Sequence, residues 1–230
     1  MANYQEEEYS LNMEAISVID QLSCVKLLMS KISDKNTGYK DFMIYGDRLM
    51  TILAEEALAS VPSVVPQDIV TPTDGVFKGL YDTRDKQLCV VSIVRAGDTL
   101  LEAFRKLEPG IRVGKILIQR NEESADKHPI FFYKKLPSDI ADCYVLLVDP
   151  MLGTAGSSMC AMDCLVEHGV DPKNVMFVNL FSCKYGLQKL LAKFPEIKVK
   201  TLSIDGYLND EKYLVPGVGD FGDRYYGTNH

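Results

Sequence analysis

The sequence predicts an α/β protein with an open, mostly parallel sheet flanked by helices. From residue 87 onward, short apolar runs alternate with stretches whose apolar residues have helical spacing, which is typical of parallel α/β sheets. Several runs are apolar on both faces, as strands must be when helices cover both faces of a sheet. The chain has 230 residues, of which 47% are hydrophobic, so it can form one sizeable core.

This regular part of the chain supplies most of the predicted elements. The expected strands are residues 88–94, 113–119, 144–148, 175–181 and 199–204, and the expected helices are 100–107, 157–168 and 187–194. Gly169 is well placed to cap the second of these helices. Ligands of open α/β sheets bind beyond the carboxyl ends of the strands. The segments after Val94, Gln119, Val148 and Ile204 are therefore the first candidates for a site.

We expect a single domain over residues 1–230. Residues 1–60 form its N-terminal helical segment, with helices over 13–31 and 42–59. Prolines break any helix between residues 61 and 82, where β-branched pieces indicate strands or an arm. Residues 61–86 and 121–140 are expected to form hood and flap elements. Within the second range, residues 121–139 are predicted to form a β-hairpin. Residues 87–230 hold the core sheet and a C-terminal loop.

Composition excludes several classes of protein. The net charge of −7 argues against a surface for nucleic acid. No apolar run approaches the roughly 20 residues that span a bilayer, and acids stand where a secretory signal would be basic, so we expect no membrane partner. Six cysteines are dispersed without a C-x-x-C pair. They are interpreted as reduced, buried thiols of a cytoplasmic protein rather than as disulfides or a zinc site.

The segment between residues 145 and 158 has the pattern of an anion-binding turn. An apolar strand ends at Asp149, and a short turn containing Gly153 and Gly156 leads into a helix. Amides of residues 154–157 would point into this turn at the helix N-terminus, where phosphate is favoured, and Thr154 and Ser157 add hydroxyl groups. Spacing alone leaves a plain helix cap as an equal alternative. Neither a G-x-x-x-x-G-K-[ST] nor a G-x-G-x-x-G motif is present.

Four segments occur in the order of a known enzyme family. In chain order they are VSIVRAGDTL (91–100), ILIQRNEES (116–124), VLLVDPMLGTAGSS (145–158) and YLVPGVGDFGDRYYGT (213–228). The segment SIDGYLN (203–209) lies just upstream of the last one. Together they resemble the uracil phosphoribosyltransferase branch of the type I phosphoribosyltransferases. The proline after Asp149 is typical of that branch. The resemblance extends from about residue 39 to the end of the chain.

The resemblance implies an activity and a donor site. Uracil would displace diphosphate from 5-phosphoribosyl 1-diphosphate (PRPP) to give UMP, a reaction of pyrimidine salvage. Arg95 and Arg120 match positions that bind the diphosphate region, and Asp149 matches the acid that contacts the ribose hydroxyls. Magnesium is implied, carried mainly by the substrate, with no protein metal site. The implied PRPP-binding residues are Arg95, Arg120, Asp149, Pro150, Met151, Leu152, Gly153, Thr154, Ala155, Gly156, Ser157 and Asp220.

The resemblance also places the base site in the C-terminal loop. Main-chain groups of Leu214, Gly219 and Phe221 would read the edge of uracil, which alternates acceptor, donor and acceptor. Asp220 matches the family's acid and is the candidate for orienting the nucleophilic nitrogen, so the implied catalytic residues are Asp220, Arg120 and Asp149. A glycine-rich surface turn is the plain alternative, although the apolar YLVPGVG segment favours inward packing.

Two departures and several alternatives stay open. Ala155 places a methyl group near the expected phosphate, as in eukaryotic-type members, and the effect of Asp98 after the R-A-G turn is undecided. A non-catalytic nucleotide-binding homologue, an RNA-binding regulator and a purine-specific transferase are weaker candidates. The family implies GTP as a possible effector and a homodimer or homotetramer, and no motif can be assigned to residues 1–40.

Overall fold

The computed structural model describes residues 11–120, without the side chain of Arg120, and residues 128–228. A sheet of eight strands forms its centre, with the strand order β1-β10-β9-β7-β4-β5-β6 and β8 added beside β9. All neighbouring pairs are parallel except β5 and β6. The strands are β1 (Ile16–Val18), β4 (Leu88–Val94), β5 (Arg112–Arg120), β6 (Pro129–Lys135), β7 (Tyr144–Val148), β8 (Met151–Leu152), β9 (Val175–Cys183) and β10 (Lys198–Asp205). The predicted fold class is confirmed.

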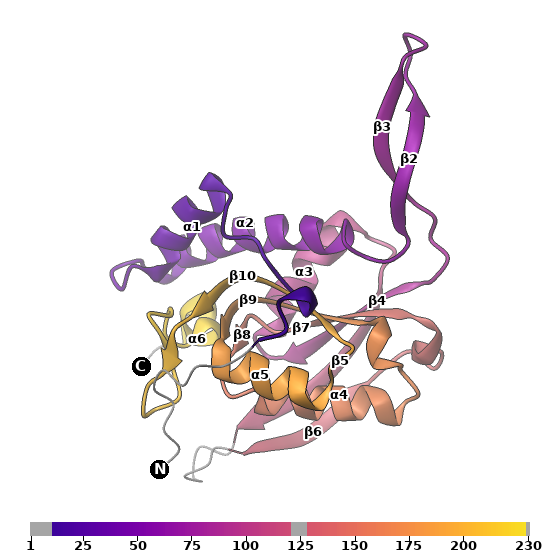
Figure 1. Ribbon diagram of the computed structural model, residues 1–230. Coiled ribbons are helices and arrows are strands. Elements are labelled where there is room, and N and C mark those ends of the chain that lie inside the picture. Colours follow the sequence, from indigo (N-terminus) through magenta and orange to yellow (C-terminus); the bar gives the residue numbers. More distant parts are fainter. Residues whose placement is uncertain (1–10, 121–127, 229–230) are drawn as a thin grey trace.

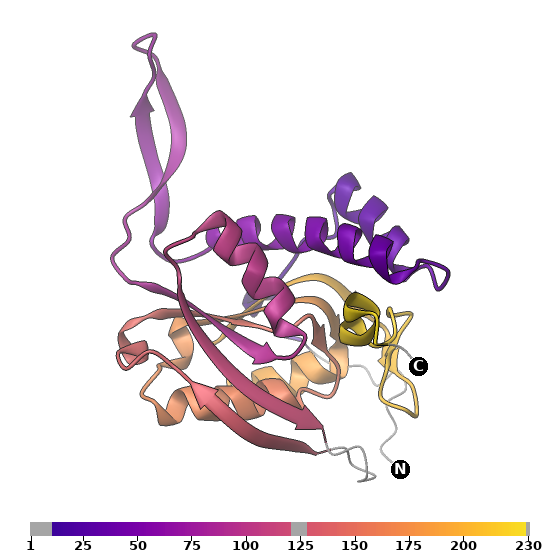
Figure 2. The ribbon, with the colours of Figure 1, turned by 180° about the vertical axis from the view of Figure 1, so that it is seen from behind.

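Helices cover both faces of this sheet (Figures 1 and 2). On one face lie α2 (Tyr39–Leu58) and α3 (Gly97–Leu107), and on the other α4 (Gly156–Glu167) and α5 (Lys184–Lys193). Side chains of a strand point alternately to the two faces. Val90 and Leu146 accordingly join the core under α2 and α3, while Val91 and Leu147 join the core under α4 and α5. This double burial explains why the central strands carry apolar residues on both faces.

The central strand β4 marks the point where the strand order reverses. β5 lies on one side of it and β7 on the other, both parallel to it. The segments that leave the carboxyl ends of β4 and β7 therefore start side by side, and Ser92 is in register with Val148. In open α/β sheets this position is where ligands bind. Arg95 and Asp149 both lie directly beyond these strand ends.

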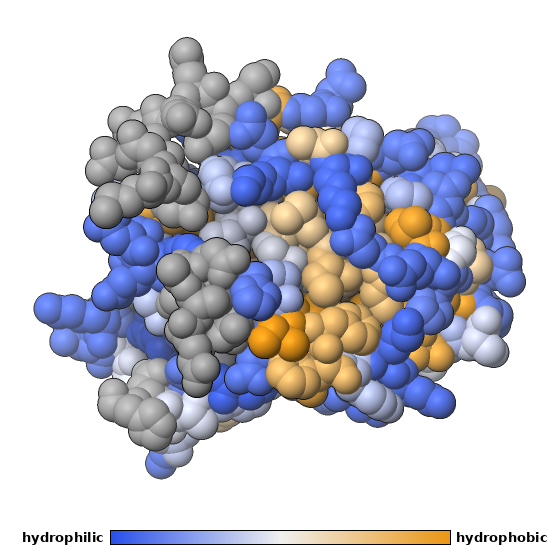
Figure 3. Space-filling view, turned by 90° about the horizontal axis from the view of Figure 1, so that it is seen from below, coloured by the Kyte–Doolittle hydropathy of each residue, from blue (hydrophilic) through white to orange (hydrophobic). Residues whose placement is uncertain are grey.

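A two-stranded arm projects from the body of the molecule (Figures 1 and 2). It consists of β2 (Val64–Val70) and β3 (Val76–Asp82), paired antiparallel along their whole length. Several of its large apolar side chains are exposed, among them Val70, Phe77 and Leu80 at 72%, 60% and 59%. Viewed from below, apolar residues also gather on the body (Figure 3), and the edge strand β6 exposes Phe131 and Phe132.

The two ends of the described chain lie against the body. At the N-terminal end, α1 (Ser23–Ser33) packs on α2. At the C-terminal end, β11 (Tyr207–Leu208) pairs with β12 (Leu214–Val215), and α6 (Phe221–Tyr226) packs on α2. Short 3-10 helices occupy Met13–Ala15, Ile140–Asp142 and Pro172–Asn174. No helix in the described ranges is long and apolar enough to cross a bilayer.

Two expectations about local structure are wrong. The predicted helix over residues 13–31 holds only from Ser23, because Ile16–Val18 instead forms β1 and pairs with Val199–Thr201 at the sheet edge. The second is the separate hairpin expected over residues 121–139, of which the structure describes 128–139. Pro129–Lys135 pairs antiparallel with β5 itself, since that strand would otherwise have an unpaired edge. The connecting residues 121–127 lie outside the described part of the chain.

Candidate active site

A cleft of about 570 Å³ opens at the carboxyl ends of β4, β5 and β7. It brings together residues from all four sequence motifs, the first and last of which are more than 100 positions apart in the chain. The sequence-predicted residues that line it are Arg95, Asp149, Met151, Gly153, Ser157, Leu214, Gly219, Asp220 and Phe221. Pro150, Leu152 and Ala155 are buried behind its wall, and Thr154 and Gly156 are partly exposed. The side chain of Arg120 lies outside the described residues.

Close backbone packing shapes the turn after β4. A methyl group at Gly97 would lie 2.5 Å from the Val148 carbonyl oxygen and 2.8 Å from Ser92 Oγ, so only glycine fits between β4 and β7. The peptide bond between Val94 and Arg95 is cis. Asp98, whose role the sequence left undecided, accepts hydrogen bonds from Ser92 Oγ at 2.8 Å and from Lys115 Nζ at 2.9 Å. Its charge is thus compensated by Lys115.

Arg95 reaches across the cleft wall to the C-terminal helix. Its Nη2 donates to Asp223 Oδ1 at 2.6 Å, and its Nη1 donates to Thr228 Oγ1 at 3.2 Å. The guanidinium also lies 5.4 Å from the centre of the Tyr226 ring. Half of the side chain is exposed to solvent. An anion bound in the cleft would therefore meet an arginine whose orientation α6 already restrains.

The turn between β7 and α4 has the geometry of an anion site. The Pro150 carbonyl accepts from the Leu180 and Phe181 amides, both at 3.0 Å, which fixes the start of the turn against β9. Ala155 then adopts left-handed φ and ψ values of 66° and 6°, and α4 begins at Gly156. The first turn of α4 carries no acidic side chain. Its unpaired amides and the helix dipole thus favour a negative group here.

The C-terminal loop packs inward, as the apolar segment predicted. Leu214 and Val218 are each 5% exposed. The bond between Val215 and Pro216 is cis, and Gly217 has a positive φ of 54°. A methyl group at Gly217 would lie 2.1 Å from the Leu214 carbonyl oxygen, so the loop requires glycine there.

Asp220 ends the loop and begins α6. Its Oδ1 accepts from the Asp223 amide at 2.8 Å, which makes it the N-cap of α6. The N-cap role, which the sequence analysis did not assign, is compatible with a second role because the carboxylate also lines the cleft. A variant that tests the role of Asp220 in the cleft therefore has to preserve the cap of α6.

Sequence reasoning missed a buried carboxylate under the loop. Asp205 at the end of β10 is 7% exposed, and burial raises its pKa above the ordinary value. Hydrogen bonds from Ser203 Oγ and the Gly217 amide act in the opposite direction and lower the pKa. Asp205 Oδ2 is buried with no hydrogen-bond partner among the described residues. The available signal was an acid directly after a buried strand.

Other cleft residues also escaped the sequence analysis. Ala96 and Gly222 belong to quoted motifs but were given no role, and Lys212 precedes the C-terminal loop. Lys212 is a cation beside the predicted base site, a signal that could have identified it. The described residues contain no cluster of three or more His, Cys, Asp or Glu side chains suited to a metal. Asp149 and Asp220 both line the cleft and supply the oxygen donors that magnesium prefers.

An anion-binding turn after one strand and an arginine after its neighbour, at the reversal point of a parallel sheet, define a phosphoribosyltransferase of the type I class. Comparison with known protein families narrows this class to one family. The family model for uracil phosphoribosyltransferase matches residues 18–228, and the chain belongs to that family.

Relatives span nearly the whole chain. Uracil phosphoribosyltransferase of Saccharomyces cerevisiae is 46% identical over 199 residues, covering 86% of this chain and 90% of that protein. The Dictyostelium discoideum uracil phosphoribosyltransferase is 41% identical over 215 residues, covering 94% and 97%. Among solved structures, the AQ2163 protein from Aquifex aeolicus is similar with a TM-score of 0.77 and 27% identity, covering 93% and 99%. Adenine phosphoribosyl transferase from Trypanosoma brucei, with a TM-score of 0.58, 10% identity and coverage of 92% and 91%, shares the fold alone.

Proposed function

We propose that the protein transfers the phosphoribosyl group of PRPP to uracil, giving UMP and diphosphate. One observation carries this proposal together with the family membership. The same cleft is lined by Arg95, Asp149 and residues of the turn before α4, and by Leu214, Gly219 and Phe221 of the C-terminal loop. A donor with a phosphate, a ribose and a diphosphate fits the first set, and a flat base that forms main-chain hydrogen bonds fits the second.

We assign the following roles in the displacement. The bond from uracil N1 to the anomeric carbon forms as the bond from that carbon to diphosphate oxygen breaks, and the N1 proton passes to water or to the leaving diphosphate. Negative charge grows on the leaving diphosphate, so cations aimed at it stabilise the transition state more than the ground state. Arg95 is placed for this, and Arg120 is proposed to assist. Asp149 would hold the ribose hydroxyls, and Asp220 would orient the N1 side of the base.

Magnesium is proposed as the cofactor. The diphosphate and ribose oxygens of the substrate would carry most of its ligand shell, and Asp149 and Asp220, which line the cleft, would contact it directly or through water. When bound, the ion would neutralise part of the diphosphate charge. Removal of magnesium with a chelator should abolish turnover, and excess magnesium should restore it. Undiminished turnover in the chelator would contradict the assignment.

A loop that binds the base through main-chain groups should discriminate between bases. Cytosine presents an amine where uracil has O4, so a donor would face a donor. An unpaired buried polar group costs about 1–3 kcal/mol, which corresponds to roughly tenfold to hundredfold discrimination. We therefore expect a much lower kcat/KM for cytosine in a spectrophotometric assay. Equal turnover of the two bases would rule out this mode of recognition.

The decisive experiment is a direct assay. Purified protein is incubated with PRPP, magnesium and each nucleobase in turn, and nucleotide products are separated by chromatography. Formation of UMP from uracil supports the proposal. Absence of product with every base, combined with measurable nucleotide binding, would instead favour a non-catalytic homologue.

Variants of Arg120 and Asp220 test the proposed mechanism. Arg120→Ala and Asp220→Ala should each lower kcat by more than about tenfold, as expected for loss of a charged group at the reacting centre. Asp220→Asn is the sharper variant, because asparagine caps helices as well as aspartate does. It should keep the thermal stability of the wild type while turnover falls. If Asp220→Asn keeps full turnover, Asp220 acts only as a helix cap.

A homodimer or homotetramer is also proposed, with the arm as the contact. Exposed apolar strands are a ready surface for pairing with a second chain, and Phe77 and Leu80 are both more than half exposed. Phe77→Asp and Leu80→Asp together should lower the mass measured by sedimentation. The matched control is Gln67→Asp on the paired strand, where the exposed wild-type side chain is already polar and lies opposite Gly79. An unchanged mass in the double variant would exclude the arm.

GTP is proposed as an effector, and the cytoplasm as the compartment. The assay with and without GTP tests the proposed effector through a change in kcat or in the KM for PRPP.

The cytoplasmic location is proposed because all six cysteines are free in this structure. Fractionation of cells that express the protein would test it, and recovery in a secreted fraction would exclude it.

A further inference from the structure

Arg224 in α6 binds four main-chain carbonyls at once. Its Nη1 donates to the Ile32 and Val218 oxygens at 2.7 and 2.9 Å. Its Nη2 donates to the Asp34 oxygen at 2.8 Å and to the Thr37 oxygen at 3.5 Å. The guanidinium also lies 4.3 Å from the centre of the buried Phe42 ring. Arg224 is only partly exposed, so most of its donors face these groups rather than water.

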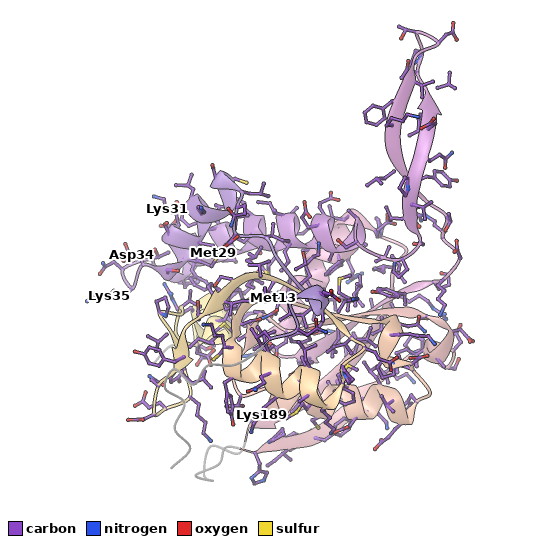
Figure 4. All side chains as sticks on the ribbon, viewed as in Figure 1. Met13, Met29, Lys31, Asp34, Lys35 and Lys189 are labelled. Atoms are coloured by element: carbon purple, nitrogen blue, oxygen red, sulfur yellow. The ribbon has the colours of Figure 1, made fainter. Side chains whose placement is uncertain are left out.

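These carbonyls belong to two segments that are far apart in sequence. Ile32 lies in the last turn of α1, and Asp34 and Thr37 belong to the turn that leads into α2. Figure 4 labels Asp34 and Lys35 on this turn, at the end of the α1–α2 pair beside the C-terminal elements of Figure 1. Carbonyls at a helix C-terminus have no partner within the helix, and a cation there is favoured. Arg224 therefore fastens the α1–α2 turn to Val218.

The hydrogen bond from Arg224 to the Val218 carbonyl also constrains Gly219, the next residue in the chain. The peptide between Val218 and Gly219 is planar and trans, so its C=O and N–H point in opposite directions. The Val218 carbonyl accepts a hydrogen bond from Arg224, and Val218 is buried. Gly219 lines the cleft and has a positive φ of 77°. Because the Arg224 hydrogen bond fixes the Val218 carbonyl, it also fixes the direction of the Gly219 N–H at the cleft.

We infer that Arg224 is a positioning residue for the base site: it orients the Gly219 amide through the Val218 carbonyl and ties that orientation to the α1–α2 turn. This rests on the proposed function, in which Gly219 reads the base. The inference gives the N-terminal helices a role that their sequence does not reveal. They provide the fixed surface against which the base loop is set.

The test compares Arg224→Gln and Arg224→Lys with wild type. Losing one oriented hydrogen bond to the base should raise the KM for uracil by about tenfold or more, while the KM for PRPP stays within about twofold. Lysine keeps the charge but cannot reach all four carbonyls, so its effect should be intermediate. Hydrogen exchange of the peptide containing Val218 and Gly219 should accelerate in both variants. Arg105→Gln, at an exposed arginine of α3, is the matched control.

Two outcomes would overturn the inference, and failure of the proposed function can be told apart from failure of the inference. An unchanged KM for uracil in folded Arg224→Gln overturns it, and an equal rise in both KM values shows a purely structural role. If Arg224→Gln does not fold, Arg224→Lys is judged by the same criteria. If wild-type protein makes no UMP, the proposed function fails, and the exchange measurement alone decides whether Arg224 orders the loop.

Discussion

At Gly97 the chain passes so close to β7 that the space, rather than the backbone conformation, requires glycine. Alanine would bring Cβ within 2.5 Å of a main-chain oxygen that sheet pairing holds in place. The same turn carries Arg95 and Asp98, so a shift of the backbone would displace both side chains. The contact therefore connects local packing with the donor site.

Gly97→Ala should destabilise the fold and impair donor binding. Overpacking of this kind costs about 1–3 kcal/mol, so the urea midpoint should fall measurably. The control is Gly110→Ala, where the added methyl group meets no atom within 4 Å. That variant should change stability by less than about 0.5 kcal/mol. Equal stability of the two variants would show that the turn after β4 can relax.

Asp205 makes stability depend on pH in a defined direction. Burial raises its pKa in the folded state, so the unfolded chain releases this proton at a lower pH than the folded chain does. The contribution of Asp205 is most favourable below the unfolded pKa and is lost as pH rises through the folded pKa. Asp205→Asn should thus gain stability relative to wild type as the pH rises above 3.8, the ordinary pKa of the carboxyl group, toward neutrality. Urea unfolding in acidic and in neutral buffer measures this, and a constant difference between the two proteins would contradict it.

At the scale of elements, the segment that opens α4 departs from ordinary helix starts. Ala155 precedes the helix in a left-handed conformation, which costs a residue with a side chain about 1–2 kcal/mol. Its methyl group is nevertheless buried, at 4% exposure. The two effects oppose each other, so glycine is tolerated here although alanine occurs.

Two alanines of this segment should therefore respond differently to glycine. Ala155→Gly relieves the left-handed strain while losing a buried methyl group, and we expect stability within about 1 kcal/mol of wild type. Ala161→Gly lies inside α4 and is fully buried, so it should cost more than about 1 kcal/mol. Thermal unfolding of both variants measures the contrast. A larger loss at Ala155 than at Ala161 would contradict this account.

At the scale of the whole molecule, thiol reactivity reports the packing around the sheet. Of the six cysteines only Cys24 is exposed, and burial raises the pKa of Cys89 to about 12. The thiolate is the reactive form. Native protein treated with iodoacetamide should be labelled first at Cys24 and more slowly at the partly buried Cys160, whereas urea should expose all six. Mass spectrometry of digests measures this, and rapid native labelling of Cys89 would show that the sheet opens.

Whole-molecule organisation also explains where prediction from sequence succeeded. Five of the strands, β4, β5, β7, β9 and β10, were predicted because burial on both faces of the sheet makes their runs largely apolar, which is a local signal. The arm was expected from its prolines and β-branched residues. The helix predicted over 13–31 was partly wrong, because Ile16–Val18 pairs with a strand some 180 residues away and no local pattern records that partner.

The sequence by itself determined the α/β class, the order of strands along the chain and the segments that line the cleft, because each has a local pattern or a family motif. Only the tertiary structure decided the strand order in the sheet, the burial of Asp205 and the bonds of Arg224. Arg224 contacts Ile32 across 192 positions, and Arg95 contacts Asp223 across 128. Such pairs arise when distant segments pack on one sheet, so their geometry depends on the whole fold.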